Sequence, residues 1–236
     1  MRKSPIILAI ETSTSNCSIA IEHQQQLFVR NEAGNNIHSS VILDCVSEVL
    51  VEASLKVSDL DAVAVGKGPG SFTGLRVGIG VGQGIAYGAG GSMIAVSSLQ
   101  ALAYQSPKDG IVLAGIDARM NEVYWGVFDK QGGIVNQLEE PKVSPPEEVL
   151  VPKRVLQEAK ENNKNIYLVG NAWQVYKDSL LTDLIMASSP ILDVLFPEAA
   201  SVLHIAHTQI EPDDWVEPSA FMPEYVRNNV AVKSVK

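Results

Sequence analysis

The sequence predicts an α/β protein made of two similar halves. Two groups of three consecutive apolar runs read as strand meanders, at residues 6–10, 17–21 and 26–31 and again at 111–116, 122–128 and 134–138. Strand and helix patterns alternate after each group, so each half combines a meander with βα units. The turn-forming residues 105–110 interrupt the pattern. We therefore expect one lobe over 1–106 and a second over 107–236.

Composition limits the class of protein. The chain has 236 residues, of which 46% are hydrophobic and 19% charged, as in ordinary globular proteins. The net charge of −9 and a pI of 4.9, without any cluster of Lys and Arg, argue against strong nucleic-acid binding by the chain itself. No apolar run approaches the roughly 18 residues of a membrane span. Glu11 ends the first run, which favours a buried strand over a signal peptide. Two cysteines make no disulfide framework, so we expect a cytoplasmic protein.

Residues 37–54 predict a helix with a wide apolar side. At 100° per residue its apolar residues cover an arc of about 160°. Either the helix is deeply buried, or one edge faces the core and the other a partner; the pattern favours burial. The residues on this arc are Ile42, Leu43, Cys45, Val46, Val49, Leu50 and Ala53.

The glycine-rich stretch 66–90 divides into a loop and a second segment from residue 75. In that segment glycines alternate with apolar residues, as in a strand, but they also form two i,i+4 stripes, as in a helix. As a helix its five interior glycines would cost roughly 5 kcal/mol against alanine, which is tolerable only if something packs very close to the bare surface. The stripes are Gly74, Gly78 and Gly82, and Gly80, Gly84 and Gly88.

The loop over 66–74 does not match the known phosphate-loop motifs. Lys67 comes too early for a Walker motif, and the glycine spacing is GxGxG rather than GxGxxG. Ser71 or Thr73 could cap a following helix, whose amides would attract an anion. A structural strand-to-helix turn is the favoured interpretation.

Other candidate groups are sparse. Glu11 and Asp117 end the first strand of each half, where paired carboxylates can hold Mg²⁺; alternatively, each is a turn or cap residue. His38, His204 and His207 do not supply the three or four ligands of a zinc or iron site. Cys17, Cys45 and Ser13 have no partner histidine at a recognisable spacing, so a nucleophile is not predicted.

Four segments together resemble the bacterial TsaB family, also called YeaZ. They are ILAIETSTSNCSIAI, GKGPGSFTGLRVGIGVGQGIA, AGIDARMNEVYWGVF and PEYVRNNVA, and they cover both halves and the C-terminus. The resemblance implies the actin-like ATPase (ASKHA, ribonuclease H-like) fold, with two similar lobes that each hold a mixed sheet and flanking helices. It also implies a helix over 74–89 and a last helix and tail, about 199–236, that pack back on the first lobe.

The resemblance further implies a role in making N6-threonylcarbamoyladenosine (t6A) in tRNA. In that system TsaB is the non-catalytic paralogue that binds and activates the transferase TsaD, and the ATPase TsaE joins the assembly, which uses ATP. Contact with tRNA is expected only through the complex. In the absence of the partner a homodimer is expected, and no contact with a membrane is expected. The alternative is an enzyme of the same superfamily, either a metal-dependent glycopeptidase or an ATP-using one.

The resemblance also implies site residues. His38 matches one of two metal-binding histidines of TsaD-like proteins, whereas Ile42 stands one turn later, so no bound metal is expected. A vestigial nucleotide site would contain Glu11, Ser13, Asp117 and Gly170. ATP binding by this chain alone is expected to be weak or lost. A nucleotide at the subunit boundary is compatible with the resemblance. The implied partner interface is His38, Ile42, Cys45, Val46, Val49, Gly74, Gly78, Val81, Gly82 and Ile85.

Overall fold

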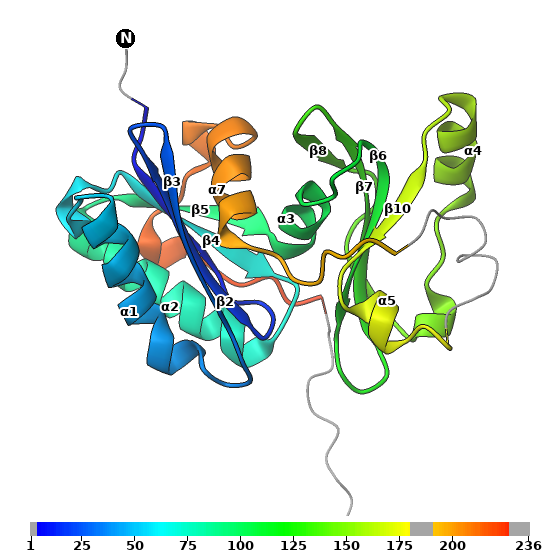
Figure 1. The fold of residues 1–236 in the computed structure, drawn as a ribbon, viewed down its shortest axis with the longest axis horizontal. Helices are drawn as coiled ribbons and strands as arrows, with labels where there is room; N and C mark the ends of the chain where they lie inside the picture. Colours follow the sequence, from blue (N-terminus) through cyan, green and yellow to red (C-terminus); the bar gives the residue numbers. More distant parts are fainter. Residues whose placement is uncertain (1–3, 180–190, 227–236) are drawn as a thin grey trace, which may run out of the picture.

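The computed structural model describes residues 4–179 and 191–226, which form two lobes side by side (Figure 1). The first lobe contains a sheet of order β3-β2-β1-β4-β5, in which β1, β2 and β3 are antiparallel neighbours and β4 and β5 run parallel to β1. Its strands are β1 Ile7–Glu11, β2 Asn16–His23, β3 Gln26–Ala33, β4 Ala62–Gly68 and β5 Ser92–Ser97.

Helices cover both faces of this sheet, so its central strands are continuous apolar runs. Alternate residues of β1 enter two different cores: Leu8 and Ile10 face α1 (His38–Glu52) and α2 (Phe72–Ala89), whereas Ile7 and Ala9 face α7 (Ala199–Thr208). The α7 side of the sheet includes four alanines, Ala9, Ala20, Ala62 and Ala64, which let that helix approach closely. The last helix therefore packs on the first lobe, across the sheet from α1 and α2 (Figure 1).

The second lobe repeats the strand order of the first. Its sheet runs β10-β6-β7-β8, with β9 paired to β7. Strands β6, β7 and β8 form an antiparallel meander, and β10 is parallel to β6, just as β4 is parallel to β1. The sequence-based prediction of two similar halves is thus confirmed. The elements are β6 Gly110–Asp117, β7 Val123–Gln131, β8 Ile134–Gln137, β9 Lys142–Ser144, α4 Lys153–Glu161, β10 Ile166–Val169 and α5 Ala172–Val175.

Helix α3 (Ser98–Tyr104) lies between the two sheets and joins the lobes. Leu99 and Leu102 belong to a core with strands β6 and β7, whereas Ala101 belongs to the core beneath α7. The Ser97 hydroxyl accepts a hydrogen bond from Gln100 N and caps the helix. The lobes therefore share a buried connecting helix, and the turn-forming residues 105–110 follow it directly.

The glycine-rich segment is a helix, as the resemblance implies. Ser71 is its N-cap, with its hydroxyl accepting from Gly74 N, and Gly90 ends it with φ of 67°. The stripe of Gly74, Gly78 and Gly82 faces the chain's own sheet.

The close packing of that stripe leaves no room for side chains. A Cβ at Gly74 or Gly78 would overlap the carbonyl oxygen or hydroxyl of Thr12, and one at Gly82 would lie 2.8 Å from Val65 Cγ2. The expectation that these three glycines receive a partner is wrong, because the first lobe already fills that surface.

The C-terminal segment over residues 216–226, called the C-terminal strap below, crosses the first lobe. Val216 pairs with Met93 of β5, and Gln83 of α2 donates hydrogen bonds to the carbonyls of Pro218 and Phe221. Phe221 is buried in the core beneath α1 and α2. The strap ends at the junction of the lobes; residues 227–236 of the predicted tail lie outside the described residues. No helix in the described ranges is both long and apolar enough to cross a membrane.

Candidate functional site

A cleft of about 620 Å³ opens between the lobes. Six parts of the chain line it: the β1–β2 turn, the start of α1, the start of α2, the β6–β7 turn with the flanking strand ends, Asn171 at the start of α5, and the end of the C-terminal strap. Of the four residues predicted for a vestigial nucleotide site, Ser13 and Asp117 line this cleft. Glu11 and Gly170 are not among its lining residues.

Glu11 is fully buried behind the cleft wall. Its Oε1 accepts a hydrogen bond from Ser13 N at 2.6 Å, and its Oε2 accepts one from the Ser98 hydroxyl at 2.8 Å. Burial raises the pKa of this carboxyl above its ordinary value, although these hydrogen bonds act in the opposite direction. Glu11 therefore ties β1 to the start of α3, the first element of the connection between the lobes.

Asp117 lies on the opposite wall and is also engaged. Its Oδ1 accepts from the Tyr176 hydroxyl at 2.7 Å and from Arg119 N at 2.8 Å, and its Oδ2 is 3.3 Å from Arg119 Nη1. Asn171 Oδ1 in turn accepts from Asp117 N. Desolvation and the hydrogen bond to Asp117 raise the pKa of Tyr176 to about 12. These contacts order the β6–β7 turn and link it to α5.

Gly170 has a structural reason to be glycine. Its φ is +114°, and a Cβ there would overlap the carbonyl oxygen of Gly115. The residue lets β10 pass close to β6, so its position is explained without a ligand.

The glycine loop before α2 packs on the β1–β2 turn. Ser71 N donates to Ser13 O at 2.7 Å, and a Cβ at Gly70 would lie 2.5 Å from Ser13 Cβ. The loop glycines allow this close backbone approach, which agrees with the structural turn favoured by the sequence.

The histidines are not brought together. His38 begins α1, while His204 and His207 lie on α7, on the other face of the first sheet. His204 stacks on Tyr104 with ring centroids 4.4 Å apart. Within residues 4–179 and 191–226, no three His, Cys, Asp or Glu side chains are grouped so that they could hold a metal ion.

Both thiols are buried in the first lobe. Burial raises the pKa of Cys17 to about 12, and it also raises the pKa of Cys45. Both side chains are therefore protonated at neutral pH, which is the state of an inert structural cysteine.

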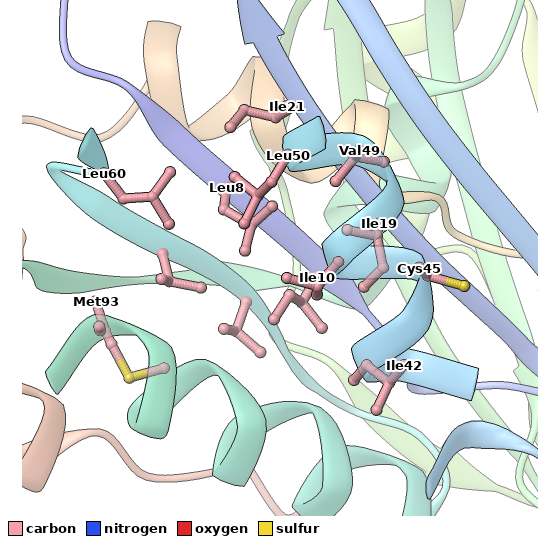
Figure 2. Packing of buried hydrophobic residues seen from close by; sticks show 14 of the residues in the cluster. Leu8, Ile10, Ile19, Ile21, Ile42, Cys45, Val49, Leu50, Leu60 and Met93 are labelled. Atoms are coloured by element: carbon pink, nitrogen blue, oxygen red, sulfur yellow. The ribbon is translucent and has the colours of Figure 1, made fainter. Parts of the chain in front are cut away.

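Most of the predicted interface residues of α1 lie beneath the helix rather than on its outer face. Ile42, Cys45, Val46 and Val49 are buried against the first sheet, and Figure 2 shows Ile42 and Val49 among residues of that sheet. These four residues therefore pack within the chain itself and are not free to contact a partner, whereas the opposite side of α1 is exposed. His38 is also buried and lines the cleft.

The outer face of α1 carries two apolar side chains that are absent from the partner interface predicted from the sequence. Leu43 is 62% exposed and Val51 is 73% exposed. Arg30 of β3 pairs with Glu48 and Glu52, which fixes the flank of α1 that faces β3. On the helical wheel Leu43 lies on the opposite flank, toward α2.

The outer face of α2 contains the second glycine stripe. A Cβ at Gly80 or Gly84 would meet nothing within 4 Å. Val81 and Ile85, both predicted for the interface, are half-buried beside this stripe on the flank toward α1. Tyr87 is 83% exposed at the same end of the helix. The periodicity had already revealed both stripes, but only the structure distinguishes the inner from the outer one.

We call the outer surface of these two helices the α1–α2 face. It carries exposed apolar side chains and open glycines on two helices that contact each other. Its residues are Leu43, Val51, Gly80, Val81, Gly84, Ile85 and Tyr87.

Comparisons with known proteins identify the family. The family model described as tRNA N6-adenosine threonylcarbamoyltransferase, TsaD, matches residues 22–233. The tRNA threonylcarbamoyladenosine biosynthesis protein TsaB of Escherichia coli (strain K12) is 36% identical over 233 residues, which cover 97% of this chain and 97% of that protein. The chain belongs to the TsaB family.

Other TsaB-family proteins agree in sequence and fold. The TsaB protein of Haemophilus influenzae is 33% identical over 97% of this chain and 96% of its own length. The solved structure of YeaZ from Pseudomonas aeruginosa superposes with a TM-score of 0.82 at 33% identity, over 94% of this chain and 99% of that one. The predicted actin-like ATPase fold, with two similar lobes, is confirmed.

Proposed function

We propose that this chain is a non-catalytic subunit of t6A synthesis, which binds and activates a TsaD-type transferase in the cytoplasm. The observation that carries the proposal is the family relationship: full-length relatives are named tRNA threonylcarbamoyladenosine biosynthesis protein TsaB. The match to the TsaD family model supports the idea that the chain is a paralogue of the transferase itself.

The positions that would support catalysis are used for structure in this chain. Glu11 is buried and holds Ser13 and Ser98, and the loop glycines make room for the β1–β2 turn. At the position one turn after His38, Ile42 packs into the core. These roles support a scaffold over the alternative of a glycopeptidase or an ATP-using enzyme. In this proposal ATP is used by the other subunits, including the ATPase TsaE.

The α1–α2 face is the surface that we assign to the partner. Exposed apolar patches on a folded protein commonly mark interaction sites, and the open glycines Gly80 and Gly84 let a helix approach α2 closely. The same surface, paired with its own copy, would form the expected homodimer. Partner binding and self-association then compete for one surface.

The interface test uses two matched substitutions. Leu43→Glu places a charge on the α1–α2 face, and Leu150→Glu makes the same change at a 53% exposed residue of the second lobe. We expect Leu43→Glu to weaken binding to the TsaD-type partner about tenfold or more, measured by titration calorimetry, because a buried charge opposes an apolar contact. Leu150→Glu should bind like the wild type.

A second pair of variants separates folding from binding. Gly84→Gln should stabilise α2 by about 0.5–1 kcal/mol, because glycine is a poor helix former, and yet should block close approach of a partner. Unchanged partner affinity in both Leu43→Glu and Gly84→Gln would rule out this face. The pathway itself is tested by depleting the chain in cells: unchanged t6A in the tRNA nucleosides, measured by mass spectrometry, would refute the proposed function.

A further inference from the structure

A second cavity, of about 390 Å³, lies beside the linker over residues 191–198, which joins the second lobe to α7 (Figure 1). Hydrogen bonds from Gly170 N to Val194 O and from Asn171 N to Leu195 O hold the linker on the second lobe. Five linker residues line the cavity, together with the first residue of β2 and the residue after α3. None of these described residues lines the interlobe cleft. The cavity is therefore a separate site, and its volume lies within the range of about 300–1,000 Å³ that small-molecule sites occupy.

Two acidic residues of the linker line this cavity and have no partner. Neither Asp193 nor Glu198 forms an ion pair or a side-chain hydrogen bond with another described residue, and no described Lys or Arg lines the cavity. Glu198 is the N-cap residue of α7, but its side chain makes no capping hydrogen bond. Two full negative charges outweigh the roughly half positive charge at the start of a helix. The lining therefore favours a cation over an anion.

A buried amide gives a second, independent indication of a ligand. Side chains alternate across β2, so Asn16 shares a face with Ser18, whose hydroxyl accepts from Ala199 N at 2.8 Å, and this face is turned toward the start of α7. Asn16 lines the cavity and is only 6% exposed, yet its side-chain amide makes no hydrogen bond with any described residue. Its amide atoms are not fully enclosed, so a ligand in the cavity can reach them. Buried polar groups are almost always hydrogen-bonded, and a ligand would explain this exception.

The remaining lining is apolar apart from one further acceptor. Val194, Leu195 and Phe196 contribute the apolar part. Gln105 Nε2 donates to Phe196 O at 3.0 Å, which fixes the orientation of this amide and leaves its Oε1 as an acceptor. A bare metal ion suits the cavity poorly, because no three His, Cys, Asp or Glu side chains in residues 4–179 and 191–226 are grouped to hold one. Apolar side chains beside carboxylates suit an organic cation instead.

We propose that this cavity binds a small alkylamine, whose ammonium group is held by the carboxylates of Asp193 and Glu198 and by the side-chain oxygen of Asn16. An ammonium group has three N–H donors and no acceptor, so it matches a lining in which acceptors outnumber donors. A short alkyl chain on the amine covers the apolar side chains of the linker. This binding by the isolated chain is separate from its proposed part in t6A synthesis, so either can fail without the other.

The test titrates the full-length chain with n-butylammonium chloride at constant ionic strength. NMR follows the backbone amide signals of residues 193–198 and the side-chain amide of Asn16. The alcohol n-butanol provides an uncharged comparison of similar size, and magnesium chloride tests for an inorganic cation.

Two variants remove the two kinds of acceptor. Asp193→Asn combined with Glu198→Gln removes both charges, and Asn16→Leu removes the buried amide. The matched control combines Asp213→Asn with Glu140→Gln, which makes the same changes at two exposed acids outside the cavity. Thermal unfolding of each variant verifies that it is folded, and the double variant decides the test if Asn16→Leu fails to fold.

We expect saturable binding of n-butylammonium that the double variant weakens about tenfold or more, because hydrogen bonds to charged acceptors are the strong ones. Asn16→Leu should weaken it about threefold or more, and the control should bind like the wild type. Failure of n-butylammonium to saturate overturns the proposal. So does equal affinity in the wild type and the double variant, or n-butanol that binds as tightly as the amine. Saturation by Mg²⁺ without saturation by the amine would identify a metal site instead and would also overturn the proposal.

Discussion

Gly82 and Gly84 are two residues apart on α2 and face opposite environments. A Cβ at Gly82 would lie 2.8 Å from Val65 Cγ2 and 3.2 Å from Met93 Cε, whereas one at Gly84 would meet nothing within 4 Å. We expect Gly82→Ala to lower the free energy of unfolding by about 1–3 kcal/mol, because overpacking a core forces neighbours apart. Gly84→Ala should raise it by about 0.5–1 kcal/mol through helix propensity. Urea unfolding of the two variants measures both; the same sign for both would contradict the packing of α2.

Glu11 makes stability depend on pH in an unusual direction for a carboxylate. Burial raises its folded-state pKa above the ordinary value of 4.5. Above pH 4.5 the unfolded chain releases this proton before the folded chain does, so this residue's contribution to stability falls as pH rises through the folded-state pKa. Glu11→Gln removes the titration and keeps an acceptor for Ser13 N. We expect the stability of the variant, relative to wild type, to increase from pH 4.5 to 7.5 in urea unfolding.

The exposed residue Glu140 provides the matched control for this pH experiment. Glu140→Gln should leave the slope of stability against pH as it is in the wild type, because the side chain is in solvent. A Glu11→Gln curve parallel to that of the wild type would mean that the carboxyl does not titrate as its burial requires.

At the scale of single residues, the sequence indicated which residues could form a site or a face, but not which neighbours surround each side chain. The sequence paired Glu11 with Asp117, because they end equivalent strands of two similar halves, but Glu11 is buried and it is Ser13 that lines the cleft with Asp117. Leu43 was placed on a wide apolar arc but proved exposed, since an arc shows only which residues are adjacent around a helix. Which edge of the arc meets the sheet depends on the neighbouring elements, here the pairs from Arg30 to Glu48 and Glu52.

Among the elements, α2 shows where local pattern fails. Its alternating glycines fitted a strand as well as a helix, and its glycines are individually unfavourable in a helix. The helix forms because the inner stripe packs tightly on Thr12 and Val65, a gain that lies in residues distant in sequence. By contrast, the strands of both meanders were predictable, because their signals are local.

One side chain of α2 holds the C-terminal strap by donating to two backbone carbonyl oxygens. Gln83 Nε2 donates to Pro218 O at 2.8 Å and to Phe221 O at 3.3 Å. We expect Gln83→Ala to cost about 1 kcal/mol of stability and to speed amide hydrogen exchange over residues 216–226, while strands of the second lobe keep their protection. Mass spectrometry of exchanged peptides measures this.

The control for the strap is Gln137→Ala, at an exposed glutamine of β8 in the second lobe. It should leave exchange of residues 216–226 unchanged. Equal exchange of the strap in wild type and Gln83→Ala would show that Phe221 and the pairing of Val216 with Met93 hold it without Gln83.

On the scale of the whole molecule, the repeated strand order explains why one chain has two lobes and a cleft. Each half pairs a meander with a parallel fourth strand, so the ends of β1 and β6 both point to the junction, where Ser13 and Asp117 line opposite walls. The duplication was readable from the order of the strand patterns. The size of the cleft and the way α3 joins the two cores were not, because they depend on packing between segments far apart in sequence.

The charge of the whole molecule leads to a final prediction about tRNA. A net charge of −9 repels a polyanion, and affinity for nucleic acid comes largely from Lys and Arg contacts to phosphates. We expect the chain alone to bind tRNA more weakly than about 10⁻⁴ M at physiological salt, in a filter-binding assay, and the assembly with its TsaD-type partner to bind more tightly. Because the partner is proposed to dock on the α1–α2 face, Leu43→Glu should remove this chain from the tRNA-bound assembly, whereas Leu150→Glu should not. Saturable micromolar binding of tRNA by the isolated chain would instead mean that a local surface overcomes the overall negative charge.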